Sequence, residues 1–171
     1  MRRTIHAIAI LALAAALFAG CGGGGESSEG GYGPTGGSST ASRPPSPSSG
    51  EGAIVSVTSV PGLGRVLVSS KGLTLYDFRR DKGGKSACYG ACAQVWPPLT
   101  TGAAPQPSNG VVVAKLGTTR RKDGTVQVTY AGHPLYLYAA DTKPGDAKGN
   151  DIDSFGGQWY ALQPSGEEAG G

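Results

Sequence analysis

Short runs of alternating apolar and polar residues fill the chain between about residues 53 and 164. A period of two residues is typical of β-strands, because successive side chains of a strand point to opposite faces. The runs are rich in β-branched and aromatic residues and are separated by glycine and proline, which favours the same structure. The pattern predicts strands over residues 54–58, 65–69, 73–78, 111–116, 125–130, 134–138 and 158–162. No stretch shows the period of a long amphipathic helix, so we expect an all-β domain of residues 53–164.

One phrase occurs twice in this domain. Residues 74–81 read TLYDFRRD and residues 134–141 read PLYLYAAD, each with a glycine four residues before its first tyrosine. Two alternating runs joined through x-Gly predict a tight β-hairpin in which Gly72 or Gly132 has a positive φ. A W-x-x-L sequence follows each phrase, at Trp96 and at Trp159. The chain therefore contains an internal repeat, with repeat one at about 63–100 and repeat two at about 123–164.

The duplicated residues indicate how the two units pack. Tyr76 and Phe78 share one face of a strand, as do Tyr136 and Tyr138. A single hairpin is marginal in water, so we expect two pseudo-symmetric repeats packed as a small sandwich or barrel-like domain. The side chains expected to fill the space between them are Trp96 and Trp159.

An aspartate ends each phrase, three residues after its second aromatic residue. These residues, Asp81 and Asp141, precede loops rich in glycine, lysine and proline. A carboxylate at such a position can accept hydrogen bonds from backbone N–H groups and close a turn. We therefore expect a turn-closing role for both.

The N-terminus predicts an export signal and a lipid anchor. Residues 1–20 have two arginines, a short apolar run and small residues ahead of Cys21, which is the form of a lipoprotein signal peptide. The run is shorter than the ~20 residues of a membrane-spanning helix. We expect Cys21 to become the lipidated first residue of a protein held at the outer face of the cell membrane, or at the outer membrane in a diderm. A plain secretory signal is the alternative.

Segments of low complexity flank the domain. Residues 21–52 consist mostly of Gly, Ser and Pro after the cysteine and contain no large aliphatic side chain, which predicts a disordered linker. A flexible chain of this length has a reach of roughly 30 Å. Residues 165–171 are predicted to be a disordered tail.

The charge of the chain is nearly balanced. It has 15 basic and 12 acidic residues, and two of the arginines belong to the signal peptide. Such a balance lacks the concentrated basic face that nucleic-acid binding requires, so we expect no nucleic-acid partner. Two basic clusters, at 79–85 and 120–122, are predicted to be solvated loop charge, with contact to anionic lipid or wall polymer as the alternative.

The repeated phrases and their surroundings resemble a known family. They read Tyr76-x-Phe78-x-x-Asp81 and Tyr136-x-Tyr138-x-x-Asp141, and further matches are Cys88-x-x-x-Cys92, WPPL at 96–99 and DGT-x-Q-x-x-Y at 123–130. This combination resembles the bacterial secreted-repeat lipoproteins with a Y-x-[FWY]-x-x-D motif. The resemblance covers about residues 63–164 and implies an exported, often lipid-anchored protein of unknown biochemical function. It implies no activity.

The remaining candidates for chemistry are few. Cys88 and Cys92 form an even pair in an exported domain, which predicts a structural disulfide, with a redox or copper-binding pair as the alternative. His133 is predicted to lie at a hairpin edge without a catalytic role. Residues 141–153 carry enough oxygen ligands for calcium but lack EF-hand spacing, so a solvated loop is favoured. We expect no cofactor and no catalytic residue.

The sequence favours a non-enzymatic, lipid-anchored module for binding or for interaction with cell-envelope components. One alternative is a redox or copper-handling protein that uses Cys88 and Cys92. Another is binding of cell-wall glycan through exposed aromatic residues of the repeats, although most of these must form the core.

Overall fold

The computed structural model describes residues 50–170 of the chain. The predicted signal peptide, the cysteine predicted to be lipidated and most of the predicted linker lie outside the described residues. The strands are β1 (Ile54–Val60), β2 (Gly64–Ser69), β3 (Tyr76–Phe78), β4 (Gln106–Pro107), β5 (Leu116–Arg120), β6 (Val126–Tyr130), β7 (His133–Pro134), β8 (Ile152–Ser154) and β9 (Gly157–Ala161). Two short helices, α1 (Ala91–Val95) and the 3-10 helix η1 (Val113–Lys115), complete the described elements.

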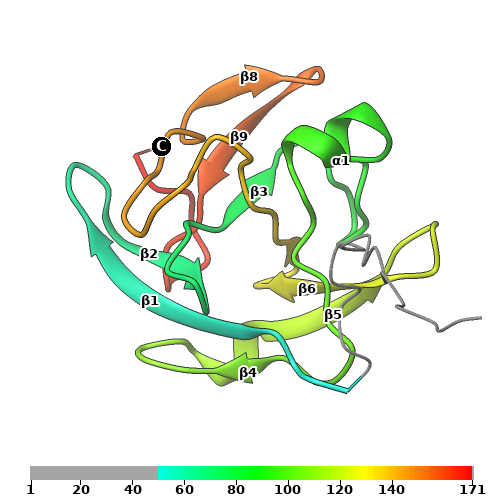
Figure 1. The fold of residues 1–171 in the computed structure, drawn as a ribbon, viewed down its shortest axis with the longest axis horizontal. Helices are drawn as coiled ribbons and strands as arrows, with labels where there is room; N and C mark the ends of the chain where they lie inside the picture. The colour runs from blue at the N-terminus through cyan, green and yellow to red at the C-terminus, as the bar shows by residue number, and fades with distance from the viewer. Residues whose placement is uncertain (1–49, 171) are drawn as a thin grey trace, which may run out of the picture. The chain divides into compact units, whose positions relative to one another are not determined.

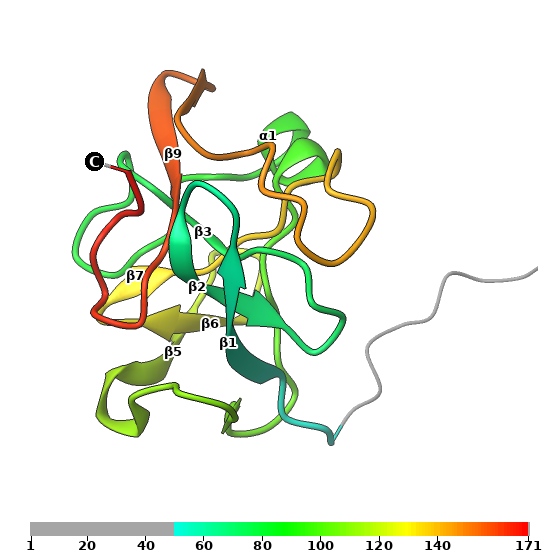
Figure 2. The same cartoon turned by 90° about the vertical axis from the view of Figure 1, so that its left-hand side faces the viewer.

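The strands form three small sheets, each of three strands. Their orders are β2-β1-β4, β3-β9-β8 and β5-β6-β7, and every neighbouring pair is antiparallel except β1 and β4. Figure 1 shows β1 and β5 in the lower half of the domain and the β8–β9 hairpin at the top. Figure 2 shows β5, β6 and β7 running across the lower part of the domain. The all-β prediction is confirmed, and the sheets do not close into a barrel.

Equivalent hydrogen bonds relate the two repeats. In the first, Leu75 N donates to Leu67 O and Leu67 N donates to Leu162 O, at 2.9 and 2.7 Å. In the second, Leu135 N donates to Val128 O at 2.9 Å and Val128 N donates to the carbonyl of Leu99 at 2.8 Å. Leu75 therefore corresponds to Leu135, and Leu67 to Val128.

The last strand of each repeat pairs with the hairpin of the other repeat. Leu162 follows Trp159 in repeat two but bonds to the first hairpin, and Leu99 follows Trp96 in repeat one but bonds to the second. In the same manner β9 pairs with β3. The repeats are thus intertwined, and the sheet β3-β9-β8 combines strands of both.

The expected hairpins form, with different turns. The first turn runs through Gly72, at φ 74°, and Gly72 N donates to Ser69 O at 2.9 Å. The second has a two-residue loop, because Tyr130 pairs with His133, and both loop residues have a positive φ, 49° at Ala131 and 86° at Gly132. Positive φ at both positions is the type I′ geometry, which matches the twist of the flanking strands.

The strands predicted at 111–116 and 134–138 differ most from the structure, and the strand predicted at 73–78 is regular only over Tyr76–Phe78. Residues 111–116 hold η1, and the strand begins at Leu116 and runs to Arg120. The prediction of a strand here was wrong because two of the three valines in the apolar run face water, Val112 at 44% and Val113 at 66% exposure. In place of the strand predicted at 134–138, only His133–Pro134 forms a regular strand. After Pro134 the chain makes isolated bridges instead, from Tyr136 to Tyr76 and to Pro98.

The C-terminal residues differ from the disordered tail that the sequence predicts. Ala169 is fully buried, and its N–H donates to Ala161 O at 2.8 Å. Glu168 forms an ion pair with Arg79 at 2.5 Å. The segment returns along β9 and covers one end of the core, which its short polar sequence does not reveal.

Candidate functional site

The centre of the molecule is a reciprocal contact between the two copies of the repeated phrase. Tyr76 N donates to Tyr136 O and Tyr136 N donates to Tyr76 O, each at 2.9 Å. An antiparallel pair of this kind relates its two residues by a local twofold rotation. The pseudo-twofold axis that relates the two repeats therefore passes between these two tyrosines, both of which are fully buried.

Each phrase is completed by the other phrase. Tyr76 Oη donates to Asp141 Oδ2 at 2.5 Å, and Tyr136 Oη donates to Asp81 Oδ2 at 2.8 Å. The tyrosine of one repeat thus bonds to the aspartate of the other. This crossed pairing explains why the motif occurs twice, and nothing in the spacing of a single copy could have revealed it.

The aspartates also have the turn-closing role that was expected. Asp81 Oδ1 accepts a hydrogen bond from Ala87 N at 2.8 Å, and Asp141 Oδ1 accepts one from Lys148 N at 3.0 Å. Each carboxylate therefore orders its own loop with one oxygen and holds the opposite repeat with the other.

Burial changes the proton affinities of these groups. It raises the pKa of Tyr76 and of Tyr136 far above that of free tyrosine, and the neighbouring carboxylates raise it further, so both phenols stay protonated as donors. Burial also raises the pKa of Asp81 to about 6, although hydrogen bonds from Ala87 and Tyr136 oppose the shift. The Asp81 carboxyl therefore titrates near neutral pH.

Four aromatic rings form one stack between the repeats. The centroid distances are 3.9 Å from Phe78 to Trp159, 4.0 Å from Trp159 to Trp96 and 4.3 Å from Trp96 to Tyr138. Each indole thus packs against the other indole and against the second aromatic residue of the opposite phrase. The predicted burial of the two tryptophans against each other is confirmed.

The two cysteines form the predicted disulfide. Cys88 and Cys92 are bonded to each other across the start of α1, with their Cα atoms 5.2 Å apart. Both residues are buried beside Trp96 in the main core cluster. Burial in apolar surroundings is typical of a structural disulfide and does not favour the redox or copper alternative.

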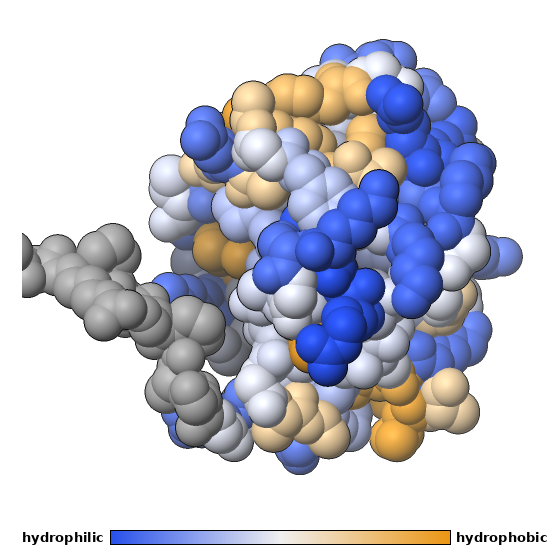
Figure 3. All heavy atoms as spheres, turned by 90° about the vertical axis from the view of Figure 1, so that its right-hand side faces the viewer, coloured by the Kyte–Doolittle hydropathy of each residue, from blue (hydrophilic) through white to orange (hydrophobic). Residues whose placement is uncertain are grey.

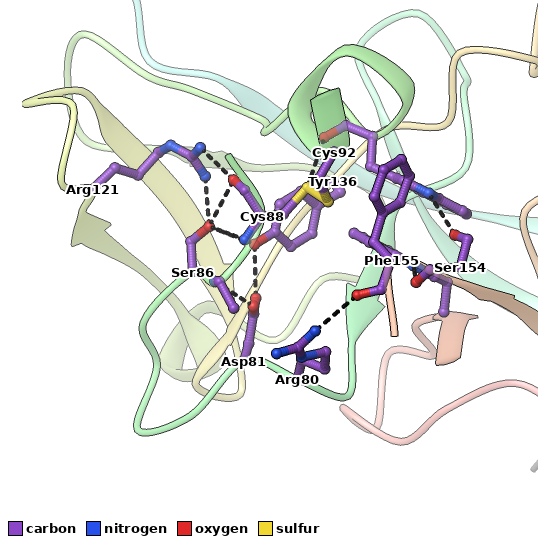
Figure 4. Close-up of a disulfide and its surroundings, with 12 residues drawn as sticks. Arg80, Asp81, Ser86, Cys88, Cys92, Arg121, Tyr136, Ser154 and Phe155 are labelled. Carbon is purple, nitrogen blue, oxygen red and sulfur yellow. Dashed lines mark hydrogen bonds between the residues drawn. A yellow bond between two sulfur atoms is a disulfide. The ribbon is translucent and has the colours of Figure 1, made fainter. Parts of the chain in front are cut away.

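One arginine of the predicted solvated clusters is buried. Arg121 Nη2 donates to Cys88 O at 2.8 Å, and Arg121 Nη1 donates to Ser86 Oγ and to Gln127 Oε1 at 2.8 and 2.7 Å (Figure 4). Its guanidinium also lies 4.4 Å from the ring centroid of Tyr89. Because these hydrogen bonds satisfy the charge, Arg121 fixes the disulfide loop from inside, and the prediction of a solvated residue is wrong for this position.

His133 lies at a hairpin edge, as expected, and has a charged partner. Its Nδ1 lies 3.2 Å from Oδ2 of Asp77, a residue of the opposite repeat. Burial raises the pKa of Asp77, and the contact with Asp77 raises the pKa of His133, whose side chain is 46% exposed. Oδ1 of Asp77 is buried without a hydrogen-bond partner. The pair links the two repeats but lacks a neighbouring nucleophile within the described contacts.

Several oxygens of the loop 141–153 are bonded within the protein. Asp146 Oδ2 accepts hydrogen bonds from Thr142 N at 3.0 Å and from Lys148 Nζ at 3.1 Å. Asp141 binds Tyr76, and Asp151 Oδ1 accepts a hydrogen bond from Tyr160. Within residues 50–170, no group of three or more His, Cys, Asp or Glu residues could hold a metal ion. The geometry gives the calcium alternative no support.

A hydroxyl-lined groove lies beside β1. Its volume is ≈ 450 Å³, within the range of ligand sites, and it is bounded on one side by β1 and β2 and on the other by the 144–145 turn. The residues that line it are Ser56, Val57, Thr58, Ser59, Val68, Ser69, Ser70, Gly72, Asn109, Pro144 and Gly145. None of these side chains is charged. Apart from Gly72, these residues belong to no motif of the sequence, because serines dispersed along a strand carry no recognisable pattern.

The comparisons with known proteins identify the family. A family model described as a secreted repeat of unknown function matches residues 57–100 and 117–163, together more than half of the chain. The chain belongs to this family. The matched segments begin within β1 and β5, so each repeat starts one strand earlier than the predicted positions 63 and 123.

For this secreted-repeat protein, the comparisons with the curated proteins and with the solved structures found no match. The description of the family agrees with an extracytoplasmic protein. Among residues 50–170, no helix has the length and apolar character needed to span a membrane.

Proposed function

We propose that this secreted-repeat protein is a lipid-anchored extracytoplasmic binding module that holds an uncharged, hydroxyl-rich ligand, such as an envelope glycan, in the groove beside β1. The observation that carries the proposal is the lining of this groove, which supplies five serine or threonine residues and one asparagine but no charged side chain. Hydroxyl and amide groups both donate and accept hydrogen bonds, as sugar hydroxyls do.

The rest of the motif supports a binding scaffold. The duplicated tyrosines, aspartates and tryptophans bond to and stack on one another, so they hold the two repeats in a fixed relation. A rigid scaffold reduces the entropy lost when a ligand binds. The glycan alternative of the sequence analysis depends on exposed aromatic residues of the repeats, but Tyr76, Tyr136, Trp96 and Trp159 are fully buried. The groove takes their place in the proposal.

The lipid anchor rests on the sequence around Cys21. A charged start, a short apolar run and Ala19-Gly20 before the cysteine are the support for diacylglycerol attachment at its thiol. Two or more acyl chains give stable anchoring where one chain does not. The Cys21→Ala chain, expressed in a bacterium with a lipoprotein pathway, is expected to lack the lipid and to leave the membrane fraction on washing with high salt. Mass spectrometry of the wild-type N-terminal peptide should show the lipid.

The groove is tested by filling it. Thr58 is an exposed residue of β1 that lines the groove, and Thr58→Arg places a long charged side chain there. The matched control is Thr118→Arg, an exposed threonine of β5 outside this groove. Binding of the acyl-free mature chain to soluble fragments of isolated cell-wall glycan, measured by calorimetry, is expected to weaken at least tenfold in the first variant and to stay unchanged in the second.

Equal binding by both variants would remove the groove from the proposal. Loss of salt-resistant membrane association in Cys21→Ala with intact glycan binding is the expected combination, since the anchor and the groove act independently. An unlipidated wild-type chain would refute the anchor without affecting the groove.

A further inference from the structure

The two basic clusters of the sequence converge on one face of the domain. Lys85 Nζ donates to Thr119 Oγ1 at 3.2 Å, and the backbone N–H of Lys122 donates to Tyr89 Oη at 3.0 Å. These bonds bring the loop after β3 against the end of β5. The exposed basic residues of the two joined segments, which we call the basic face, are Arg80, Lys82, Lys85 and Lys122.

Within residues 50–170, no residue of the basic face forms an ion pair with a carboxylate. Among its nearest carboxylates, Asp123 is paired with the buried Arg121 at 3.2 Å, and Asp81 is bonded to Tyr136. Because the chain as a whole is nearly neutral, this clustering means that positive charge is segregated to one side. Hydrophilic side chains gather across the face that Figure 3 shows, with an apolar area at its upper edge.

An exposed aromatic residue borders the basic face. Phe155 lies at the tip of the β8–β9 hairpin with its side chain 42% exposed, and its carbonyl accepts a hydrogen bond from Arg80 Nη1 at 3.0 Å (Figure 4). Ser154 pairs with Gly157, so the loop is Phe155-Gly156, with φ of 54° and 76°. This type I′ turn favours Asn or Gly at the first position, and a bulky side chain is strained there.

The hairpin tip is held rigidly. Trp96 Nε1 donates to Ser154 Oγ at 3.1 Å, and Trp159 Nε1 donates to Ser154 O at 3.2 Å. Both stacked indoles thus fix the residue before Phe155. A large apolar side chain kept exposed at a strained position on a rigid support contributes little to folding, so an observed outlier of this kind points to a role in binding.

The point at which the chain enters the domain from the predicted linker indicates what the basic face binds. Gly50, the first described residue, lines the same hollow as Gly124 and Thr125 in the turn between β5 and β6, next to Arg120 and Lys122. Residues 22–49 are the stretch between Cys21 and this point. A chain tethered to a bilayer through Cys21 would therefore enter the domain beside the basic face.

We propose that the basic face and Phe155 dock the domain on the anionic surface of the membrane that carries the protein. Lysine and arginine side chains near such a surface are attracted to acidic headgroups, and an exposed aromatic ring can enter the boundary of the acyl chains. The docking proposal extends the proposed lipid anchor. It is tested on a chain without lipid, so one proposal can be refuted while the other stands.

The test uses the acyl-free mature chain, residues 22–171, which keeps all of both core clusters. Its binding to vesicles of phosphatidylcholine with about a third phosphatidylglycerol is measured by co-sedimentation, with vesicles of phosphatidylcholine alone as reference. We expect binding to the anionic vesicles that weakens strongly between about 0.05 and 0.5 M NaCl. Equal binding to both vesicle types would overturn the proposal.

Two variants and a matched control locate the contact. Lys85→Glu with Lys122→Glu is expected to weaken partition to anionic vesicles roughly tenfold or more. Lys71→Glu with Lys143→Glu makes the same change of charge at exposed lysines in turns next to the groove and is expected to bind as the wild type does. Equal loss in both pairs would assign the effect to net charge and overturn the assignment to this face.

Phe155→Asn separates docking from folding. Asparagine suits the turn better than phenylalanine, so the thermal midpoint is expected to stay equal or rise, while binding to anionic vesicles falls roughly fivefold. Unchanged vesicle binding would remove Phe155 from the contact. Retention of the chain by soluble poly(glycerol phosphate) but not by anionic vesicles would identify wall polymer as the partner and overturn the membrane proposal.

Discussion

At the scale of single residues, two hydrogen bonds, each between a tyrosine of one repeat and an aspartate of the other, hold the halves of the domain together. The sequence predicted the local role of Asp81 and Asp141, because a carboxylate at the start of a loop bonds to nearby N–H groups. It did not predict their bonds to Tyr136 and Tyr76, since the partners are far apart along the chain. Burial makes these bonds important, because an unpaired carboxylate away from water is costly.

Tyr76→Phe removes one of the crossed bonds and leaves Asp141 Oδ2 without its buried donor. The free energy of unfolding is expected to fall by roughly 1–3 kcal/mol in chemical denaturation. The control is Tyr160→Phe, which removes a tyrosine–aspartate bond of 2.8 Å to the exposed Asp151 and should cost less than about 1 kcal/mol. Equal losses in the two variants would contradict the structural importance of the crossed pair.

The raised pKa of Asp81 predicts how stability depends on pH. The folded protein binds this proton with a pKa of about 6, against an ordinary aspartate pKa of 3.8 in the unfolded chain, so protonation favours folding. The contribution is present below about pH 4 and is lost as the pH rises through about 6, amounting to roughly 1–3 kcal/mol. Thermal midpoints between pH 5 and 7.5 should fall with rising pH in the wild type.

Asp81→Asn isolates this group. The raised pKa values of Asp77 and His133 act in the same direction, so some pH dependence should remain in the variant. The slope between pH 5 and 7 is expected to be shallower than in the wild type. An identical slope would assign the effect to the Asp77–His133 pair instead.

At the scale of elements, the turns and strand ends carry the differences between prediction and structure. The x-Gly signal predicted both hairpins correctly, because Gly72 and Gly132 meet a steric requirement that is local to the turn. The strand predicted at 111–116 was wrong because an apolar run does not show which side chains the core covers. The disulfide is again local, since its two cysteines are separated by only three residues.

Replacing both Cys88 and Cys92 by serine is expected to lower the free energy of unfolding by roughly 2 kcal/mol, because the loop that the bond closes is short. The midpoint of urea unfolding measures the change. Treating the wild type with reductant under unfolding conditions should give the same shift, which controls for the effect of the serines. A far larger loss would mean that the bond also determines the packing of Trp96, which lies beside it in the core.

At the scale of the whole molecule, the exchange of the tryptophan strands makes the two repeats one cooperative unit. Trp96 stacks on Trp159 and Tyr138, both of the second repeat, and the backbone after Trp96 pairs with the second hairpin. Each half therefore lacks both a strand and a core partner when it is alone. The duplication predicted two similar halves, but their intertwining follows only from the tertiary structure.

A chain of residues 50–112, which contains the first repeat, is expected to be unfolded. Its amide proton spectrum should lack the dispersion of a folded β protein, whereas the chain 50–171 should show it. Mixing separately made first and second halves, the latter covering 113–171, is expected to restore dispersion if the exchanged strands can find their partners. A well-dispersed spectrum of either half alone would contradict the cooperative interpretation.

Strand content, the twofold repetition, the hairpin glycines and the disulfide could all be predicted from the order of the amino acids, because each depends on residues close together in the chain or on a simple period. The folded arrangement was needed to show that Tyr76 bonds to Asp141, that Arg121 is buried, and that the hydroxyl groove and the basic face exist. These features join segments that are distant in sequence. Their geometry depends on how the sheets pack, which no local pattern of side chains encodes.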